Sequence, residues 1–222
     1  MPNLQTYNDM TVELMQATEH PACMVGLAQS ITTHAEAESI PCLTHRQCEF
    51  LIDAEHTSLF EHVVYTFLVQ GVSRSFLAQI TRQRTASPTS GSQHYQDYSD
   101  YPCSVATPGI NERLYEESTA QAYKTYELLL ANGVPKEEAR QVLPNAACVN
   151  YLWTIDARNL FFFLRQRLCN RNVLEMRIFA NKVLDHVQMH FPELFEHAGP
   201  QCHAGKCKQG FMQCKQRGWV RV

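Results

Sequence analysis

The sequence predicts an α/β or α+β fold, with a central mixed or antiparallel sheet flanked by helices in a single domain. Residues 62–69 and 149–155 are rich in β-branched and aromatic side chains, which favours strands. Between and after them, apolar residues recur at helical spacing. The chain has 222 residues, enough for one buried core, and we find no internal repeat. We therefore expect residues 1–222 to form one domain, with a cysteine-containing tail at about 198–222.

The other elements are predicted in chain order. Apolar residues at helical spacing predict a helix at 8–18. Gly71 is expected to end the first strand, and Ser73 to cap the next helix. Residues 87–109, rich in Pro, Ser, Thr and Gly, predict a loop that is either mobile or functional. The breaker Gly133-Val134-Pro135 separates two later helices. The remaining expected helices span residues 45–54, 111–131, 136–142, 157–168 and 173–190.

Composition restricts the classes of protein that fit. Hydrophobic residues make up 45% and charged residues 18%, as in a folded globular chain. The formal charge is -3, whereas a duplex-binding protein is usually basic. We therefore expect no nucleic-acid partner, although Arg74, Arg82 and Arg84 crowd one short stretch.

We expect a cytoplasmic protein without a membrane anchor. The first twenty residues lack the cationic start and apolar run of a signal peptide, and no apolar run reaches the length of a membrane span. Without a secretory signal, the nine cysteines are expected to be free thiols. Tail cysteines at 202, 207 and 214 do not have a standard zinc spacing, and a metal or disulfide clamp is the minority interpretation.

A cationic turn is the first candidate site. Arg82 and Arg84 follow the helix after Ser73 and precede a loop rich in hydroxyls and glycine. Guanidinium groups bind phosphate through paired hydrogen bonds, and loop hydroxyls and amides can surround the same anion. Alternatively, the two arginines bind the carbonyls of the helix C-terminus and the loop only connects. The residues alone leave both interpretations open.

Two further clusters flank the strands. His56 and His62 are six residues apart, which does not match a helical metal pair, so we expect no metal site there. Arg158 falls in the first turn of a predicted helix, where the helix dipole disfavours a cation. This position indicates an anionic partner, which is either a ligand or a carboxylate of this chain.

Together these clusters make the sequence resemble the flavin-dependent thymidylate synthases. The family signature is Arg-His-Arg, seven residues, then Ser; here Arg82-Gln83-Arg84 is followed after seven residues by Ser92. The likeness covers nearly the whole chain. Its other matches are Glu61-His62, Gly133-Val134-Pro135, Ala139-Arg140, Leu143-Pro144, Ala157-Arg158, Arg167, Asn170-Arg171 and Glu175.

The resemblance implies a role for each matching residue. It implies a catalytic Arg167 and places Arg82 and Arg140 on the phosphate of the substrate. The nucleotide site it implies comprises Gln79, Arg82, Ser90, Gly91, Ser92, His94, Arg140 and Arg167. The FAD site it implies comprises His56, Ser58, Arg82, Gln83, Arg84, Asp156, Arg158, Phe162 and Arg171.

The implied reaction is methylation of uracil C5 in dUMP, and also in UMP, by a homotetramer. Methylenetetrahydrofolate supplies the carbon, and NADPH supplies electrons through FAD. Arg167 would stabilise the uracil anion formed when N3 loses its proton, so no cysteine nucleophile is required. The hydride step belongs to the flavin.

Four residues depart from the family pattern. Gln83 replaces the middle histidine of the signature, His94 replaces an arginine, and Asp156 and Phe162 each replace an asparagine. A histidine is only partly charged at pH 7, so His94 weakens anion binding in the loop around the substrate. The reaction type is expected to persist, while the choice between dUMP and UMP stays open.

Three other interpretations remain. A UMP-specific methylase of nucleoside-antibiotic pathways has the same chemistry. A flavoprotein of this fold that only oxidises a reduced nicotinamide would keep the cofactor and lose methylation. An RNA-binding module would use the loop tyrosines and arginines, since aromatic stacking beside cations binds single strands. The net negative charge of the chain and the family matches far from the loop count against the RNA-binding module.

Overall fold

The computed structural model describes residues 4–33, 41–105, 112–203, 205, 207, 209–214, 219 and 221–222. The chain forms two compact units. Unit 1 comprises Met1–Glu13, Leu68–Arg84 and Pro88–Trp153, and unit 2 comprises Leu14–Phe67, Thr85–Ser87 and Thr154–Val222.

The central element is an antiparallel four-stranded sheet, which confirms the predicted α/β class. Its order is β2-β3-β6-β4, so β3 and β6 are the inner strands. A second sheet pairs β1 with β5 in parallel, with Leu4 opposite Cys103. The strands are β1 Leu4–Thr6, β2 Thr11–Ala17, β3 Val64–Ser73, β4 Ser87–Ser90, β5 Cys103–Val105 and β6 Cys148–Asp156.

Most predicted helices are confirmed, with ends within a residue or two of the expected ones; the helix predicted at 136–142 is instead divided into a short α-helix and a 3-10 helix. Ser73 caps α3 as expected, because its Oγ accepts a hydrogen bond from the Phe76 amide at 3.0 Å. The α-helices are α1 Pro21–Thr33, α2 His45–Asp53, α3 Arg74–Ile80, α4 Glu112–Ala131, α5 Lys136–Ala139, α6 Ala157–Arg167, α7 Leu174–His190 and α8 Pro192–Phe195. The 3-10 helices are η1 Tyr7–Asp9, η2 Thr57–His62, η3 Arg140–Val142 and η4 Gly210–Met212. Among the described residues, no helix is both long and apolar enough to cross a bilayer.

The predicted helix at 8–18 is wrong, because this segment forms η1 and then strand β2. Met10 and Val12 are buried two residues apart, which is the spacing of a strand. Asp9 is the last residue of η1. Its carboxylate accepts a hydrogen bond from the Thr6 amide at 2.6 Å and closes the short η1 turn.

The predicted end of the first strand at Gly71 is also wrong, since β3 continues to Ser73. Gly71 has a φ of +74°, a conformation that glycine adopts without strain. Side chains replace the regular strand ladder there: the Gly71 amide donates to Asn150 Oδ1 at 3.0 Å, and Gln5 Nε2 donates to the Gly71 carbonyl at 2.7 Å. The glycine therefore marks an irregularity within the strand.

The long loop at 87–109 contains more order than expected. Strands β4 and β5 lie within it, and residues 106–109 fall outside the described residues. The prediction of free thiols is wrong for Cys23 and Cys42, which form a disulfide.

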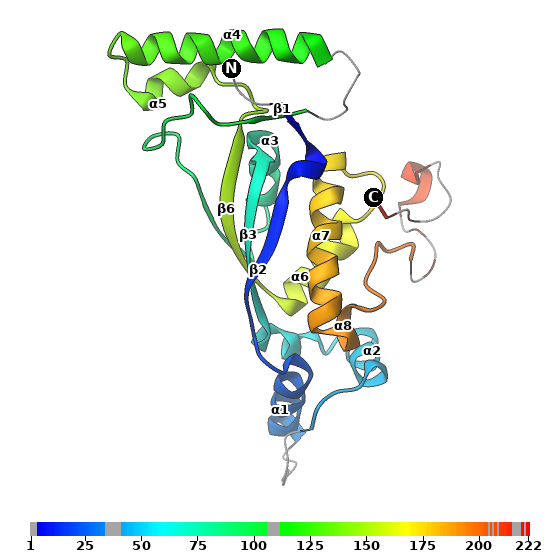
Figure 1. The fold of residues 1–222 in the computed structure, drawn as a ribbon. Helices are drawn as coiled ribbons and strands as arrows, with labels where there is room; N and C mark the ends of the chain where they lie inside the picture. Colours follow the sequence, from blue (N-terminus) through cyan, green and yellow to red (C-terminus); the bar gives the residue numbers. More distant parts are fainter. Residues whose placement is uncertain are drawn as a thin grey trace. The chain divides into compact units, whose positions relative to one another are not determined.

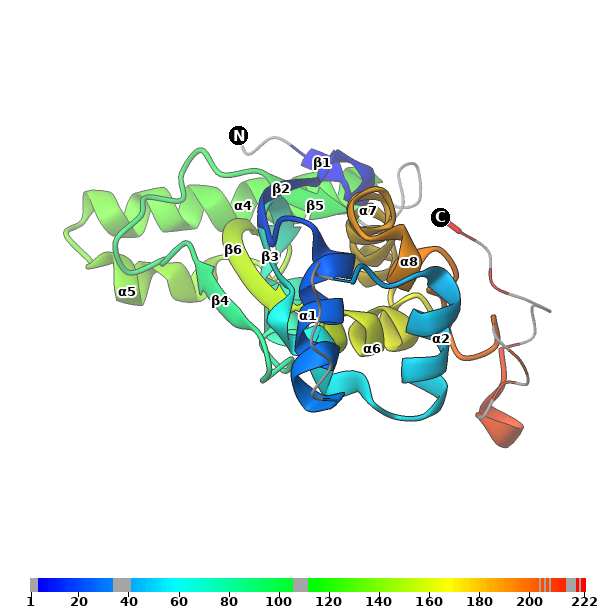
Figure 2. The same ribbon diagram turned by 90° about the horizontal axis from the view of Figure 1, so that it is seen from below.

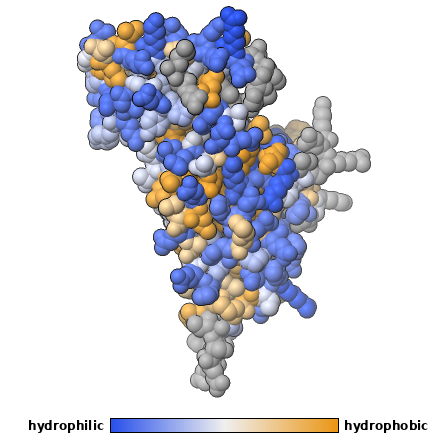
Figure 3. All heavy atoms as spheres, viewed as in Figure 1, coloured by the Kyte–Doolittle hydropathy of each residue, from blue (hydrophilic) through white to orange (hydrophobic). Residues whose placement is uncertain are grey.

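Each unit packs helices against its own core. In unit 1, α4 lies along α5 (Figure 1), and Tyr98, Tyr126 and Ala139 form a buried cluster there. The surface of α4 is mostly hydrophilic in Figure 3, with hydrophobic atoms gathered toward the end that carries the exposed Leu128. In unit 2, α7 packs beside α6, and α2 packs beside α8 (Figure 2). Tyr65 of β3 is buried there, with its ring edge-to-face against Phe195.

The turn between α4 and α5 yields a prediction about stability. Gly133 has a φ of +81°, and the amides of Gly133 and Val134 donate to the carbonyls of Leu130 and Leu129, which is the Schellman pattern. A Cβ at 133 would have open space around it, so only backbone strain opposes a side chain. We expect Gly133→Ala to lower the free energy of unfolding by about 1–2 kcal/mol in urea titration. Gly133→Asn should cost less, because asparagine tolerates this conformation; equal losses would contradict the argument.

Candidate active site

The cationic turn of unit 1 is formed by the end of α3 and the residues that follow it. The Arg82 amide donates to the Gln79 carbonyl at 3.1 Å, which continues the helix by one turn. Arg82 and Arg84 are exposed, whereas Gln79 and Gln83 are half-buried. Neither guanidinium makes a hydrogen bond to another described residue. The structure therefore does not support the alternative in which these arginines bind the carbonyls at the end of the helix.

The loop after β4 is fixed to β6 through its backbone. The Gly91 amide donates to the Asn150 carbonyl at 2.9 Å. Just beyond it, the Ser92 carbonyl accepts from the Tyr95 and Gln96 amides at 3.2 and 2.9 Å, closing one turn. A Cβ on Gly91 would lie 2.6 Å from Gln96 Oε1, so a glycine fits this approach. Ser90, on β4, is exposed, and Ser92 is half-buried.

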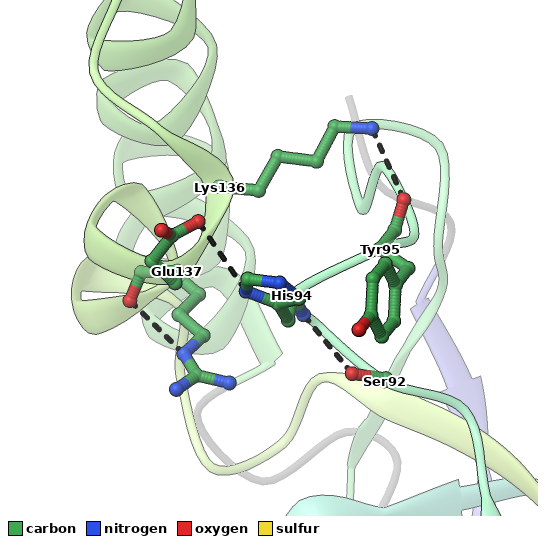
Figure 4. A network of polar contacts seen from close by, with 6 residues as sticks. Ser92, His94, Tyr95, Lys136 and Glu137 are labelled. Carbon is green, nitrogen blue, oxygen red and sulfur yellow. Dashed lines mark hydrogen bonds and ion pairs between the residues drawn. The ribbon is translucent and has the colours of Figure 1, made fainter.

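His94 and Arg140 meet through Glu137 of α5. His94 Nδ1 lies 3.4 Å from Glu137 Oε2, and the two form an ion pair when the imidazole is protonated. Arg140 Nε donates to the Glu137 carbonyl at 3.1 Å. On the other side of the loop, Lys136 Nζ donates to the Tyr95 carbonyl at 3.2 Å (Figure 4). Two neighbouring residues of α5 thus hold the loop that carries the predicted nucleotide ligands.

In unit 2, the junction of β6 and α6 positions Asp156 and Arg158. Asp156 caps α6: its carboxylate accepts from the Asn159 amide at 2.9 Å and from Asn159 Nδ2 at 2.6 Å. The Arg158 guanidinium forms an ion pair with Glu61 at the end of η2. The anionic partner expected for Arg158 is therefore, in this structure, a carboxylate of the chain itself. His56 and Ser58, at the start of η2, are exposed.

Arg167, the last residue of α6, has an unusual environment. Its guanidinium lies over the Phe163 ring, 5.7 Å from the centroid. Its Nε is buried and has no hydrogen-bond partner among the described residues. Burial lowers the pKa of this arginine from its ordinary value. A buried donor without an acceptor is costly, so this atom is suited to an acceptor other than the described residues.

Arg171 lies in the turn between α6 and α7, where its Nη1 donates to Gln209 Oε1 at 2.9 Å. It lines a cavity of about 290 Å³ together with residues of the tail. Phe162 is exposed on α6 and packs edge-to-face against Phe161.

The structure gathers some predicted residues and separates others. His94 and Arg140 both contact Glu137, and Asp156 and Arg158 both lie at the junction of β6 and α6. Arg158 and Arg167, nine residues apart on α6, lie roughly 13 Å apart along the helix axis. Most predicted nucleotide ligands belong to unit 1, whereas Arg167 and most predicted FAD ligands belong to unit 2.

Sequence reasoning missed Glu137, Lys136 and Gln209. Glu137 lies three residues before Arg140, a helical spacing that indicates contact with Arg140. No local signal pairs Glu137 with His94, because 43 positions separate them in the sequence.

Curated relatives are similar to this chain over most of its length. A flavin-dependent thymidylate synthase of Geobacter sulfurreducens is 30% identical over 228 residues, covering 96% of this chain and 97% of the relative. Another from Nitratidesulfovibrio vulgaris is 33% identical over 223 residues, covering 90% and 91%. One from Sulfurisphaera tokodaii is 39% identical over 149 residues, covering 65% of this chain. That match spans only 58% of the length of the Sulfurisphaera protein.

A solved structure and a family pattern complete the comparison. A UMP/dUMP methylase of Streptomyces cacaoi, bound with 5-Br dUMP, superposes with a TM-score of 0.75 at 23% identity, covering 87% of this chain and 95% of the other. At that identity, the likeness shows a shared fold. The pattern of the family described as "Thymidylate synthase complementing protein" matches residues 13–193. This match covers well over half of the chain, which therefore belongs to the thymidylate synthase complementing protein family.

Proposed function

We propose that this protein is a methyltransferase that uses FAD to methylate C5 of the uracil ring of a nucleotide. The substrate is dUMP, with UMP accepted as a second substrate. Methylenetetrahydrofolate donates the carbon and NADPH reduces the flavin. Membership of the family supports this proposal, and one observation on this chain carries it: the buried Arg167 Nε has no hydrogen-bond partner among the residues that the structure describes. A UMP-specific methylase is the alternative within the same chemistry.

Arg167 suits the activation of a uracil ring. The ring becomes nucleophilic at C5 when N3 loses its proton and negative charge spreads over the ring oxygens. A guanidinium stays charged even when burial lowers its pKa, because its ordinary value lies far above neutrality. Its planar donors match a pair of acceptors on the ring edge, and partial burial strengthens the attraction. Arg167 thus stabilises the anion electrostatically, and no cysteine nucleophile is needed.

The donor set also fits FAD, which when bound supplies the hydride that completes the methyl group. Arg84, Arg158 and Arg171 offer guanidinium groups for its phosphates. Arg158 and Arg171 are held by Glu61 and Gln209, which are exposed side chains. Exposed ion pairs contribute only about 0–1 kcal/mol, so phosphate oxygens displace the Glu61 carboxylate at little cost.

The nucleotide phosphate is assigned to Arg82 and Arg140, with the turn at Ser90, Gly91 and Ser92 beside it. We further propose that the protein acts in the cytoplasm as a homotetramer whose sites combine residues of several subunits. Light scattering of the purified protein measures this state directly, and an active monomer would contradict it.

Arg167→Lys is the direct test of the proposed function. Lysine keeps the charge and loses the planar fork, so we expect the turnover of dUMP to fall about 10²–10³-fold. Arg165→Lys, on the same helix, is the matched control and should retain activity. Turnover with methylenetetrahydrofolate and NADPH is the measurement. An Arg167→Lys enzyme as active as the wild type would exclude the electrostatic role.

The flavin assignment is tested by binding. Purified protein should carry a flavin absorption band, and Arg158→Ala should weaken FAD binding, because a cation that faces the phosphates is removed. The control is Arg113→Ala, which deletes a similar exposed ion pair, with Glu117 on α4. Fluorescence titration with FAD gives the affinities. Equal affinity in wild type and Arg158→Ala would remove Arg158 from the site.

Selectivity for the sugar should depend on His94. An arginine at this position is always charged and can bind the Glu137 carboxylate through two hydrogen bonds, which tightens the loop around the substrate. We expect His94→Arg to raise kcat/KM for dUMP relative to kcat/KM for UMP. The expected change corresponds to the free energy of one hydrogen bond, about 0.5–1.5 kcal/mol. His45→Arg is the matched control, because His45 pairs with Glu196 at 2.6 Å in unit 2. An unchanged ratio in His94→Arg would show that this departure does not affect substrate choice.

A further inference from the structure

Three thiols line one cavity of unit 2. The cavity measures about 290 Å³, and Cys169, Cys202 and Cys207 contribute to its wall. All three side chains are half-buried, so the thiols are sheltered without being sealed inside the core. Arg165 and Arg171 line the same cavity and give it a positive charge. None of the three cysteines has a role in the proposed nucleotide chemistry.

Backbone and side-chain hydrogen bonds position this cavity. The Asn172 amide donates to the Cys169 carbonyl at 2.9 Å, which holds the turn after α6. The His203 amide donates to the Pro200 carbonyl at 2.7 Å and closes a turn around Cys202. The bond between Arg171 and Gln209 joins the two segments. The thiols are thus brought together by the fold of the tail on the α6–α7 turn.

The thiols also affect one another electrostatically. Burial raises the pKa of Cys202, and the thiols of Cys207, Cys169 and Cys214, in that order, raise it further. Within the part of the chain that the structure describes, no group of three or more metal ligands is arranged to hold an ion.

We propose that this cavity is a thiol–disulfide exchange site, in which Cys202 and Cys207 switch between two thiols and one disulfide. Both cysteines belong to the tail and line the wall of the same cavity. The reactant is a small-molecule disulfide that carries carboxylates, because Arg165 and Arg171 line the cavity and attract anions.

The exchange proceeds in two steps. The Cys207 thiolate attacks one sulfur of the small disulfide, which forms a mixed disulfide and releases one small thiolate. Cys202 then loses its proton and attacks the Cys207 sulfur, which forms the Cys202–Cys207 disulfide and releases the second thiolate. Two protein thiols lose two electrons and two protons, and one small disulfide is reduced to two thiols. Burial raises the pKa of Cys202, which suits it to the second step.

Peptide mapping of the full-length protein tests this site without using turnover. The native protein is equilibrated with reduced and oxidised glutathione in graded ratios, free thiols are alkylated, and the peptides are identified by mass spectrometry. We expect a peptide pair linked through Cys202 and Cys207, with a mass loss of two hydrogens, to replace the alkylated thiols as the buffer becomes oxidising. Buried Cys48 and Cys103 are internal controls and should stay as thiols.

Two variants and a second reagent sharpen the test. Cys207→Ser should abolish the cross-link, whereas Cys214→Ser, the matched tail variant, should retain it. Cystamine, a cationic disulfide, should react about tenfold more slowly than oxidised glutathione. The proposal is overturned if Cys202 and Cys207 stay alkylated throughout, if each links to another cysteine instead, or if metal analysis finds stoichiometric zinc protecting them.

Discussion

The hydrogen bond from the Ala157 amide to the Val63 carbonyl, 2.7 Å long, fixes the point where β6 ends and α6 begins. Both residues are fully buried, so this bond forms where water cannot replace it. Without a connecting loop, the strand direction sets the helix direction. The site residues Asp156, Arg158 and Arg167 therefore take their positions from one junction. Glu61 lies just before Val63, which explains why its carboxylate faces Arg158.

The arginines of the candidate site fall into two physical classes. Arg158 and Arg171 are held by exposed polar side chains of the chain itself, and water or a ligand can replace such partners at small cost. Arg167 has a buried Nε without a hydrogen-bond partner among the described residues, so none of these residues competes for that donor. The first class suits the binding of a cofactor that must be gained and released. The second suits a charge that is held ready for the reacting ring.

Strong local signals allowed much of the fold to be predicted. The cap at Ser73, the breaker at Gly133 and the aromatic strand at residues 62–69 each depend on neighbours in sequence. The segment at 8–18 failed because its short apolar pattern fits both helical and strand spacing, and pairing with β3 decides between them. The candidate site, like the fold, was predicted only in part. The motif residues were found from their types, but Glu137 and Gln209 were not, because the fold alone brings them to His94 and Arg171.

The departures from the family pattern have local physical accounts. Asp156 caps α6 as an asparagine would, and its negative charge suits the positive end of the helix dipole. His94 faces Glu137. The arginine of the family pattern is always charged, whereas a histidine is charged only when it is protonated. Glu137 also accepts a hydrogen bond from Arg140 through its carbonyl. A change at position 94 can therefore affect Arg140, a proposed phosphate ligand, through Glu137. The substitution therefore affects the contacts between the loop and α5, while Arg167, which belongs to unit 2, keeps its place over the Phe163 ring.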